Sequence, residues 1–403
     1  MSDPADLVRR VRDGELRLYE LESHADHETA TAVRRMVVEE ETDTSLETTG
    51  AYAFDAGLAE SNIENMVGAI QVPMGVAGPL PVDGGSASGE YYLPLATTEG
   101  ALVASVNRGC AVVRKAGGAS ARVLDAGMTR APVFHVADVA AAERVVAWVE
   151  ENRAVLADAA EATTSHGELL DIDPYVVGDN VFLRFRFDTK DAMGMNMVTI
   201  ATRAACEMIE DETEASLVAL SGNLCTDKKP AAINAIEGRG RTVSADVTIP
   251  RAVVEDRLHT TPEAIAAVNT RKNLIGSAKA GSFGFNAHVA NVVAATFLAT
   301  GQDEAHAVEG ANAITTVDAR EDGLYASVNL ASLPVGTVGG GTTLPTQTEA
   351  LDVLGLRGGG DPPGSNADAL AEVIAAGALC GELSLLGALA SRHLSSAHEE
   401  LGR

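Results

Sequence analysis

The hydrophobic positions at the start of the chain follow the spacing of short amphipathic helices. Apolar residues gather around Leu7 and again around Leu18, with charged residues between them. This pattern predicts a small helical domain over residues 1–62. From Glu64 the pattern changes, because ENMVGAIQVPMGVAGPLPVDG is dense in glycine, proline and small apolar residues. That composition favours a turn-rich wall over a long helix or a regular strand.

Three helices and one strand are expected in the middle of the chain. The segment TTEGALVASVNRGCAVVRKAGG predicts a buried helix of small residues that Thr97 caps and a glycine pair ends. VADVAAAERVVAWVEENRAVLADAA predicts the second helix, and the third begins near Asn196. Between them, VFLRFRFD predicts a strand, because phenylalanine and arginine alternate in it.

Two further helices are expected after Ser221. FNAHVANVVAATFLAT predicts a helix that is apolar on nearly every side and therefore central. LRGGGDPPGSNAD predicts a surface loop at about residues 356–368, before a final helix rich in alanine and leucine. Together the elements predict an α+β protein, whose large domain is discontinuous and is built around the central helix. Its two parts are residues 63–131 and 219–403, and residues 132–218 form a compact inserted domain.

The charge of the chain argues against nucleic acid as a partner. The 57 acidic and 30 basic residues give a net charge of −27, which repels phosphate groups. Only six of the basic residues are lysines, and the acidic residues are dispersed, a composition typical of adaptation to high salt. The first thirty residues do not resemble a signal peptide, and no run of about 18 uncharged apolar residues occurs. We therefore expect a cytoplasmic protein without a membrane span.

The cysteines do not have the spacing of a metal site. Cys110, Cys206, Cys225 and Cys380 are scattered along the chain, without CxxC or Cys/His ligand spacing. Four cysteines placed in this way also do not suggest a disulfide framework. We expect free thiols and no bound metal.

The densest group of chemically active side chains is SGNLCTDKKPAAIN, which begins at Ser221. Asp227, Lys228 and Lys229 are adjacent in it, and this density of charge suits an anionic ligand. A lysine beside a reacting carbonyl stabilises the developing oxyanion, and apolar neighbours strengthen that interaction. A solvated surface turn is the alternative interpretation of the same residues.

Three other residues gain meaning only in combination. Glu99, at the start of a predicted helix, and Asp303, in ATGQD, are ordinary helix-end residues when each is considered alone. Two carboxyl groups near one lysine can nevertheless raise the pKa of one carboxyl group and provide a general acid at neutral pH. His398 lies in the terminal segment SRHLSSAHEELGR, where a histidine is usually solvated. These residues alone predict an enzyme with an anionic ligand.

Seven segments occur in a fixed order between about residue 60 and residue 400: ENMVGAIQVPMGVAGPL, TTEGALVASVNRGC, DAMGMNM, SGNLCTDKKPAAINAIEGRG, GSFGFNAHVAN, ATGQD and GTVGGGT. The set resembles the motifs of class I 3-hydroxy-3-methylglutaryl-coenzyme A (HMG-CoA) reductases, in a soluble, archaeal, halophile-like form. The resemblance implies an NADPH-dependent oxidoreductase that converts (S)-HMG-CoA to (R)-mevalonate in isoprenoid biosynthesis. It also implies a ferredoxin-like inserted domain, and a homodimer or homotetramer with active sites between subunits.

The resemblance also implies roles for individual residues. Lys228 would stabilise the oxyanion of both reductions, and Glu99 would donate a proton to the aldehyde oxygen. Asp303 would tune both residues, and His398 would protonate the departing CoA thiolate. The HMG group would contact Arg130, Ser221, Asn223, Asp227, Lys229 and Lys272, with Asn291 orienting Glu99 and Asp303, whereas CoA would contact Tyr19, Ser105, Asn107 and Arg108. NADPH would contact Asp191, Met193, Gly194, Met195, Asn196, Val338, Gly339 and Gly340, with Ser165 and His166 at its 2′-phosphate.

Two other functions stay open at this point. A non-catalytic acyl-CoA-binding protein would not need Glu99, Asp303 and His398 together. A hydrolase with Cys225 as its nucleophile would need a histidine base near the thiol and would consume no nicotinamide cofactor. The two alternatives therefore predict different side chains around the ligand.

Overall fold

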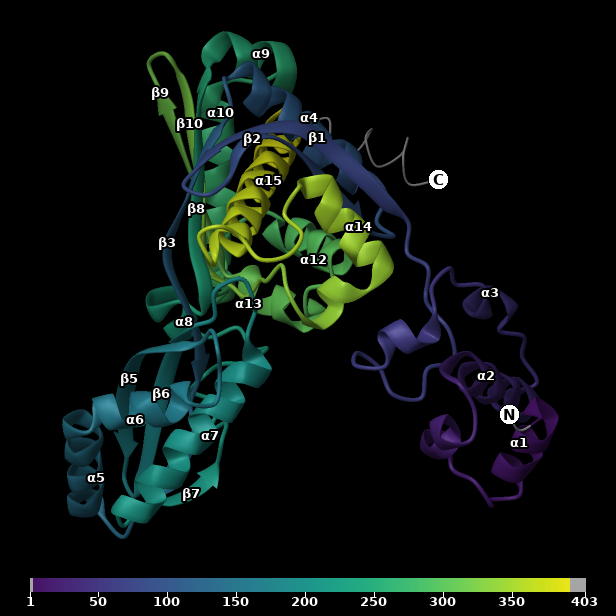
Figure 1. Ribbon diagram of the computed structural model, residues 1–403. Coiled ribbons are helices and arrows are strands. Elements are labelled where there is room, and N and C mark those ends of the chain that lie inside the picture. The colour runs from purple at the N-terminus through teal and green to yellow at the C-terminus, as the bar shows by residue number, and fades with distance from the viewer. Residues whose placement is uncertain (1–2, 392–403) are drawn as a thin grey trace.

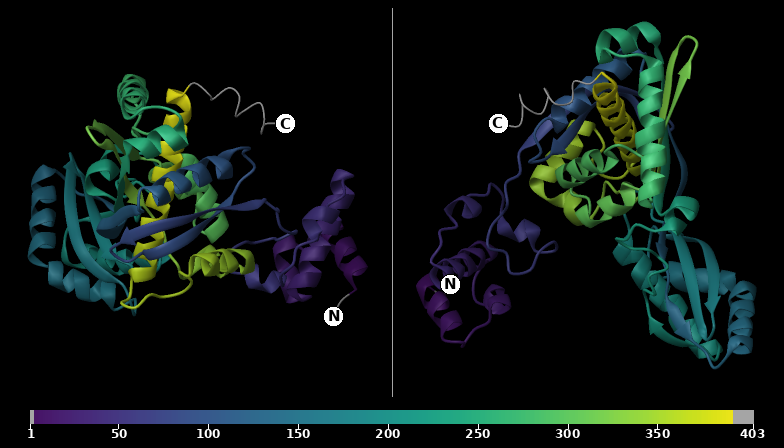
Figure 2. Two further views of the ribbon diagram at one scale, coloured as in Figure 1. Left: turned by 90° about the horizontal axis from the view of Figure 1, so that it is seen from above. Right: turned by 180° about the vertical axis from the view of Figure 1, so that it is seen from behind.

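The structure, a computed structural model, describes residues 3–391, and its N-terminal elements are a group of helices set apart from the rest (Figures 1 and 2). Asp3 and Asp26 accept backbone N–H bonds at the starts of α1 and α2. Leu7, Leu21 and Val33 lie in a small core between the helices. The prediction of short amphipathic helices is therefore confirmed. The elements are α1 Pro4–Arg12, the 3-10 helix η1 Leu18–Ser23, α2 His27–Thr42, α3 Glu47–Gly50 and the 3-10 helix η2 Ala56–Ala59.

A ten-stranded sheet extends through the rest of the molecule. Its main path has the order β7-β4-β6-β3-β8-β10-β9, with β1, β2 and β5 paired off this path. Strand β3 connects the two parts of the sheet, because it pairs with β8 along most of its length and with β6 at its end (Figure 1). The strands are β1 Met74–Gly84, β2 Ser88–Ala96, β3 Ala119–Arg130, β4 Val133–His135, β5 Glu168–Val177, β6 Asn180–Asp188, β7 Ser216–Ala219, β8 Gly240–Pro250, β9 Ala313–Arg320 and β10 Gly323–Leu333.

The glycine- and proline-rich segment after Glu64 departs from its prediction. Residues 64–73 form no helix or strand, but β1 is an eleven-residue strand that pairs with β2. The register shifts between Ala77 and Leu80, where Gly78 has a φ of +139°. An irregularity of this kind allows a segment rich in glycine and proline to join a sheet.

The central helix is α15 Ser365–Ala390, whereas the sequence pattern had given that place to FNAHVANVVAATFLAT. Helix α15 packs against α4, β3, β8 and β10, and nearly all of its residues are buried. It is long and apolar enough to cross a membrane, but most of its surface is covered by the protein's own elements, as in a core helix. FNAHVANVVAATFLAT forms the shorter helix α12 Val289–Thr300, which packs against β2, α14 and α15.

The helix predicted from Thr97 begins five residues later. Helix α4 spans Leu102–Lys115, and the Thr97 hydroxyl accepts the backbone N–H of Glu99 at 3.0 Å in the loop before it. Glu99 is therefore an exposed loop residue, not a helix cap. The remaining elements of this part are α8 Ala232–Glu237, α9 Arg251–Leu258, α10 Pro262–Val268, the π-helix η3 Asn269–Gly276, α11 Ser277–Ala280, the 3-10 helix η4 Glu304–His306, α13 Ala307–Gly310, the 3-10 helix η5 Gly340–Thr343 and α14 Pro345–Leu354.

The segment between β3 and Ser221 has its own hydrophobic core. The predicted helix after residue 135 is divided at Asn152 into α5 Val139–Glu151 and α6 Arg153–Glu161, while α7 Met195–Glu212 begins where expected. Strand β6 buries Phe185 and Phe187, but Arg184 is also buried and donates to the Gly238 carbonyl at 2.7 Å. The alternation in β6 therefore separates a buried face from a partly buried one, not from a fully solvated one.

Candidate active site

A cleft of about 710 Å³ lies where α7, the glycine-rich loop 336–341 and the segment after α12 meet. Most of the residues around it come from motifs that the sequence singled out. The cleft is lined by the predicted site residues Arg130, Met193, Gly194, Met195, Asn196, Asp227, Lys228, Asp303, Val338, Gly339 and Gly340. Three segments that are distant in sequence thus form one concave surface, which is the usual setting of an active site.

Close backbone contacts shape the wall of this cleft. A Cβ atom added to Gly301 would lie 2.3 Å from the Gly341 carbonyl oxygen, and one added to Gly336 would lie 2.4 Å from the Met193 nitrogen. Only glycine therefore fits at these crossings. The glycine-rich loop is in this way held against both α7 and the segment that carries Asp303.

The start of α7 provides a polar end to the cleft. Gly194 precedes the helix with a φ of +90°, and no side chain caps the helix there. The first backbone N–H groups of such a helix attract anionic groups. Met197 lines the cleft one turn later, and Gly167 lies against it in the loop that carries Ser165 and His166. The structure therefore brings these two residues near the cleft edge without making them part of its lining.

Lys228 and Asp303 form an ion pair at the cleft. The Lys228 Nζ atom lies 2.9 Å from Asp303 Oδ2, and the Lys228 side chain is 46% exposed. The hydrogen bond to Asp303 raises the pKa of Lys228, so that the ammonium form is favoured. Asp303 is itself held by the Ala305 backbone N–H, which donates to its Oδ1 atom at 3.1 Å. The pair places a fixed positive charge on the wall of the cleft.

The loop that carries Lys228 has an unusual backbone. Of the eight non-glycine residues with positive φ within residues 3–391, three are in this loop, namely Asn223, Thr226 and Lys228. The left-handed conformation is unfavourable for residues with a side chain, and it persists only where the surroundings impose it. Ser221 contacts the Cys225 thiol at 3.3 Å, and the Lys229 ammonium donates to the Asp227 carbonyl at 3.0 Å. Neither Ser221, Asn223 nor Lys229 lines the cleft.

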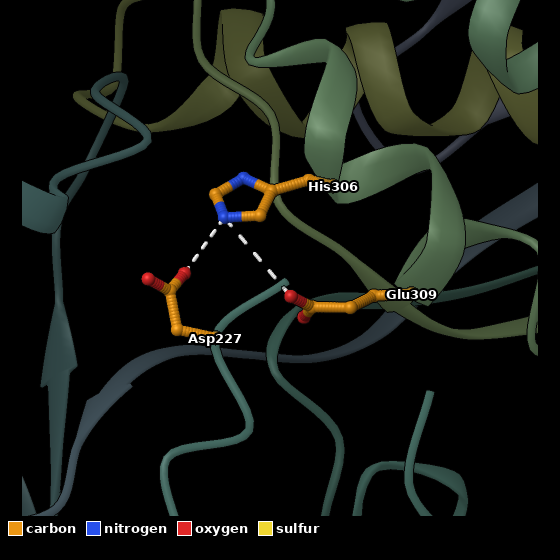
Figure 3. A group of neighbouring side chains, drawn as sticks. All are labelled: Asp227, His306 and Glu309. Carbon is orange, nitrogen blue, oxygen red and sulfur yellow. Dashed lines mark hydrogen bonds and ion pairs between the residues drawn. The ribbon is translucent and has the colours of Figure 1, made fainter. Parts of the chain in front are cut away.

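A buried polar group beneath this loop was not anticipated from the sequence. His306 Nε2 lies 2.9 Å from Asp227 Oδ1, and Glu309 lies beside both residues (Figure 3). Arg239 connects them, because it donates to Asp227 Oδ1 at 2.9 Å and to Glu309 Oε2 at 2.8 Å. The His306 bond lowers the pKa of Asp227, whereas burial raises the pKa of Glu309. The only sequence signals were an arginine in IEGRG and the i, i+3 spacing of His306 and Glu309.

Comparison with known proteins assigns the family. Residues 30–403 match the family described as hydroxymethylglutaryl-coenzyme A reductase. The 3-hydroxy-3-methylglutaryl-coenzyme A reductase of Haloferax volcanii is 72% identical over 403 residues, which cover 100% of both chains. The enzyme of the same name from Halobacterium salinarum is 71% identical over 402 residues, which cover 100% of this chain and 99% of the relative.

The chain belongs to the hydroxymethylglutaryl-coenzyme A reductase family. Relatives from halophilic archaea agree with the acidic, lysine-poor composition. A structure of the class II 3-hydroxy-3-methylglutaryl-CoA reductase from Streptococcus pneumoniae, bound to NADPH, superposes with a TM-score of 0.67 and 20% identity. It covers 93% of this chain and 96% of that chain, so the fold is shared with a distant member of the reductase family.

Glu99, the acid that the reductase resemblance implies, lies away from the Lys228–Asp303 pair. Its Oε1 atom accepts a hydrogen bond of 3.2 Å from Asn291, near the start of α12, whereas Asp303 follows the end of that helix. At about 1.5 Å per residue, the helix places Asn291 about 14 Å from the C-terminal end of α12. Within one chain Asn291 donates to Glu99 but makes no bond to Asp303, so its role toward both carboxylates stays a prediction. His398 lies outside the described residues.

The residues expected to hold CoA in a reductase of this family are not gathered in one place. Arg108 Nε donates to the Ser384 hydroxyl at 2.9 Å, and Ser105 contacts the same hydroxyl at 2.8 Å. Asn107 accepts the Gly78 N–H at 3.1 Å, so these three residues lie where α4 meets α15 and β1. Tyr19 is exposed in the separate N-terminal group. Lys272, which was expected at the HMG group, is exposed on the π-helix η3.

Asp191 does not face the cleft, which corrects its expected role as a cofactor contact. Its carboxylate is buried and accepts four backbone N–H bonds of 2.7–3.1 Å from Gly360, Gly364, Asn366 and Ala367. Asp191 therefore fixes the start of α15 relative to the DAMGMN segment.

The cysteine-hydrolase alternative finds no support around Cys225. All four cysteines are buried and unpaired, as expected for free thiols. The side chain in contact with the Cys225 thiol belongs to Ser221. His306, the histidine of the neighbouring buried network, is hydrogen-bonded to Asp227 and not to the thiol. The arrangement lacks the thiol–imidazole contact of a cysteine nucleophile.

Proposed function

We propose that this chain reduces (S)-HMG-CoA to (R)-mevalonate and free CoA with two equivalents of NADPH, as a class I enzyme of isoprenoid biosynthesis. One observation carries the proposal: a single cleft contains the Lys228–Asp303 pair together with the DAMGMN segment and the glycine-rich loop. A fixed cation beside a cofactor site suits hydride transfer to a carbonyl, because the carbonyl oxygen becomes negative as the hydride arrives. Family membership and the full-length identity to named reductases support the same reaction.

Each catalytic residue has a distinct chemical task in this proposal. NADPH supplies the hydride for both reductions. Lys228, kept protonated by Asp303, stabilises the oxyanion that forms from the thioester and later from the aldehyde. Glu99 donates the proton that the aldehyde oxygen needs to become an alcohol. His398 protonates the CoA thiolate as it leaves, a role that rests on the family resemblance alone.

The binding residues are proposed on the same basis. Arg130 lines the cleft and lies 3.9 Å from Asp227 Oδ2, so its guanidinium can pair the free carboxylate of the HMG group. Polar residues of the loop and of other elements complete this subsite: Ser221, Asn223, Asp227, Lys229, Lys272 and Asn291. CoA contacts are assigned to Tyr19, Ser105, Asn107 and Arg108, and NADPH contacts to Met193, Gly194, Met195, Asn196, Val338, Gly339 and Gly340, with Ser165 and His166 at the 2′-phosphate.

We also infer that a second subunit completes each site. Glu99 and the Lys228–Asp303 pair are at opposite ends of α12, yet the reaction needs them on one substrate. A two-fold related copy can bring Glu99 of one chain to Lys228 of the other. A homodimer, alone or paired into a tetramer, is the proposed form of the enzyme.

The domain organisation is proposed from the three larger hydrophobic clusters. One cluster lies within residues 1–62, one lies within 132–218 apart from Met128 at the end of β3, and the largest lies within 63–131 and 219–403. The strand order β7-β4-β6-β5, antiparallel throughout, and the βαββαβ succession support a ferredoxin-like fold for the inserted domain. An α+β protein with an acidic surface and a buried α15 fits a location in the cytoplasm.

The test is nicotinamide absorbance in concentrated KCl, with HMG-CoA as substrate and NADPH or NADH as cofactor. We expect two NADPH to be oxidised for each CoA released. Lys228→Ala should abolish this oxidation, while Lys115→Ala, a change at an exposed lysine at the end of α4, should leave it unchanged. Absence of oxidation by the folded parent protein would overturn the reductase assignment and favour a non-catalytic acyl-CoA-binding protein.

A further inference from the structure

The buried group beneath the Lys228 loop touches that loop at two defined atoms. Glu309 Oε1 accepts the backbone N–H of Lys228, and Arg239 donates to Asp227 Oδ1. The side chains of Arg239, His306 and Glu309 are 0% exposed, so substrate does not reach them. Their contacts are therefore with the loop, not with the reacting groups.

The loop has features that make such contacts necessary. Lys228 has a φ of +57°, a conformation that its own side chain disfavours. Its side chain is nearly half exposed, so packing around the side chain does little to fix the ammonium group. The position of Nζ therefore depends on its bond to Asp303 and on the backbone of Lys228, and the carboxylate of Glu309 holds the N–H of that backbone unit.

Arg239 links this support to the cofactor side of the cleft. One of its Nη atoms, Nη1, donates to Glu309, while Nη2 lies 2.9 Å from Asp227 Oδ1 and 2.8 Å from the Met195 sulfur atom. Met195 is the first residue of α7 and lines the cleft. A planar guanidinium spreads its donors over a rigid fork and can bridge three such groups, whereas an ammonium has all its donors on one atom.

The same cluster has the composition of a metal site, but its geometry favours an ion-pair network. Asp227, His306 and Glu309 have ligand atoms within 4.8 Å of one another. The guanidinium of Arg239, however, already lies within hydrogen-bond distance of both carboxylates and supplies the positive charge between them. His306 Nε2 also lies in direct contact with Asp227 (Figure 3). A divalent cation placed there would be repelled by the arginine.

We propose that Arg239 and Glu309 are positioning residues of the reductase, which set the backbone of Lys228 and the carboxylate of Asp227 relative to the cofactor helix α7. The inference rests on the proposed role of Lys228 in stabilising the oxyanion. It adds that this role depends on a network that substrate does not contact. His306 belongs to the network as the second donor to Asp227 Oδ1.

The test compares Glu309→Gln and Arg239→Lys with the parent enzyme in steady-state assays. Misplacement of a catalytic group by about 1 Å costs about 100-fold in rate. We expect kcat to fall by roughly that factor in Glu309→Gln and less in Arg239→Lys, with KM for HMG-CoA and NADPH within about threefold of the parent values. The stoichiometry of NADPH binding measures the fraction of folded enzyme. A smaller folded fraction is then not mistaken for a lower kcat.

Glu372→Gln is the matched control. Glu372 is also a buried glutamate that accepts backbone N–H groups, from Gly85, Ser86 and Ala87, but it lies in α15 outside the cleft. The Glu372→Gln substitution should change thermal stability and leave kcat per folded enzyme unchanged. If Glu309→Gln and Arg239→Lys behave like this control, the inference is wrong. Arg239→Lys keeps the buried charges balanced and decides the question if Glu309→Gln does not fold.

Lys228→Ala, assayed in parallel, separates this inference from the proposed function. Retention of kcat in Lys228→Ala would overturn the role of Lys228, and the inference with it. Loss of kcat in Lys228→Ala, with unchanged kcat in both network variants, would overturn only the inference. Loss of kcat in all three variants, with KM preserved in the network variants, is the expected result.

Discussion

The two ends of helix α12 differ in how completely the chain builds the chemistry beside them. After the C-terminal end, Asp303 pairs with Lys228 at 2.9 Å, and a network of three buried side chains, Arg239, His306 and Glu309, supports the loop from below. Near the N-terminal end, Glu99 is exposed, and Asn291 is its side-chain partner at 3.2 Å. The contrast shows that Lys228 and Asp303 are preorganised within one chain and Glu99 is not, and it is the reason for proposing that a second subunit supplies the surroundings of Glu99.

The largest predicted effect comes from placing one inactivating substitution at each end of α12, on different subunits. Lys228→Ala and Glu99→Gln should each lower activity about 1000-fold or more, since each removes a group needed in the transition state. Subunits carrying the two changes, co-expressed with different tags, should regain activity, because a mixed dimer contains one intact site in two. The purified mixed dimer should therefore have about half of the parent activity, and an unfractionated mixture from random assortment about a quarter.

The measurement is NADPH oxidation by the purified mixed oligomer, with each single variant as its own control. Recovery would show that Glu99 and Lys228 act on one substrate from different chains. If the mixed oligomer remains as inactive as the single variants, the two residues act from the same chain. Helix α12 would then have to move or Glu99 would have no part in the reaction.

The second prediction concerns the preorganised end. Asp303→Asn removes the hydrogen-bond partner that raises the pKa of Lys228, so the ammonium should lose its proton at lower pH than in the parent. We expect kcat to fall about 100-fold, and the alkaline limb of its pH profile to move to lower pH. Assays between about pH 8 and 11 would detect the shift. Asp318→Asn, a change at an exposed carboxylate on β9, should leave the profile unchanged.

What the sequence could predict also differs between regions. The start of α7, strand β6 and the N-terminal helices followed from local periodicity, because each of these elements is defined by its own residues. The choice of central helix was wrong, because α12 and α15 are both apolar on all sides and only their packing partners distinguish them. Strand β1 was missed because its bulge reconciles glycine and proline with a sheet, and local pattern cannot show a bulge.

The candidate site shows the same division. Lys228, Asp303, the DAMGMN residues and the glycine-rich loop line one cleft, as the motifs suggested. Asp191 was misassigned, because its four backbone partners are about 170 residues away in sequence. Arg239 and Glu309 were missed for a similar reason, since a buried ion pair between distant segments leaves no periodic signal.

A smaller effect is expected at the open end of α12. Asn291→Ala removes the amide that donates to Glu99, and no other side chain within residues 3–391 makes a hydrogen bond to that carboxylate. We expect a fall in kcat of about tenfold, because the acid remains but its orientation is no longer fixed. Substitution of the half-buried Asn180, at the start of β6 and outside the cleft, is the matched control. A fall as large as that of Glu99→Gln would mean that Asn291 does more than orient the acid.

The smallest predicted effect distinguishes the two carboxylates that share Arg239. The bond from His306 depresses the pKa of Asp227, so its contribution to stability is present above the unfolded value of about 4 and is lost as pH falls below it. Burial raises the pKa of Glu309, so its contribution has the opposite sign: stability increases as pH falls toward about 4. The parent should therefore lose stability only below about pH 4 through this network.

Asp227→Asn should remove the loss of stability that the parent shows below about pH 4, and the opposite pH dependence that Glu309 contributes should remain. The difference in unfolding free energy between about pH 7 and pH 3 should be smaller than in the parent by roughly 1 kcal/mol, because Asp227 is only partly buried. Urea unfolding at constant KCl measures it. Parallel curves for parent and variant would show that ionisation of Asp227 contributes no measurable stability at neutral pH, in spite of its lowered pKa.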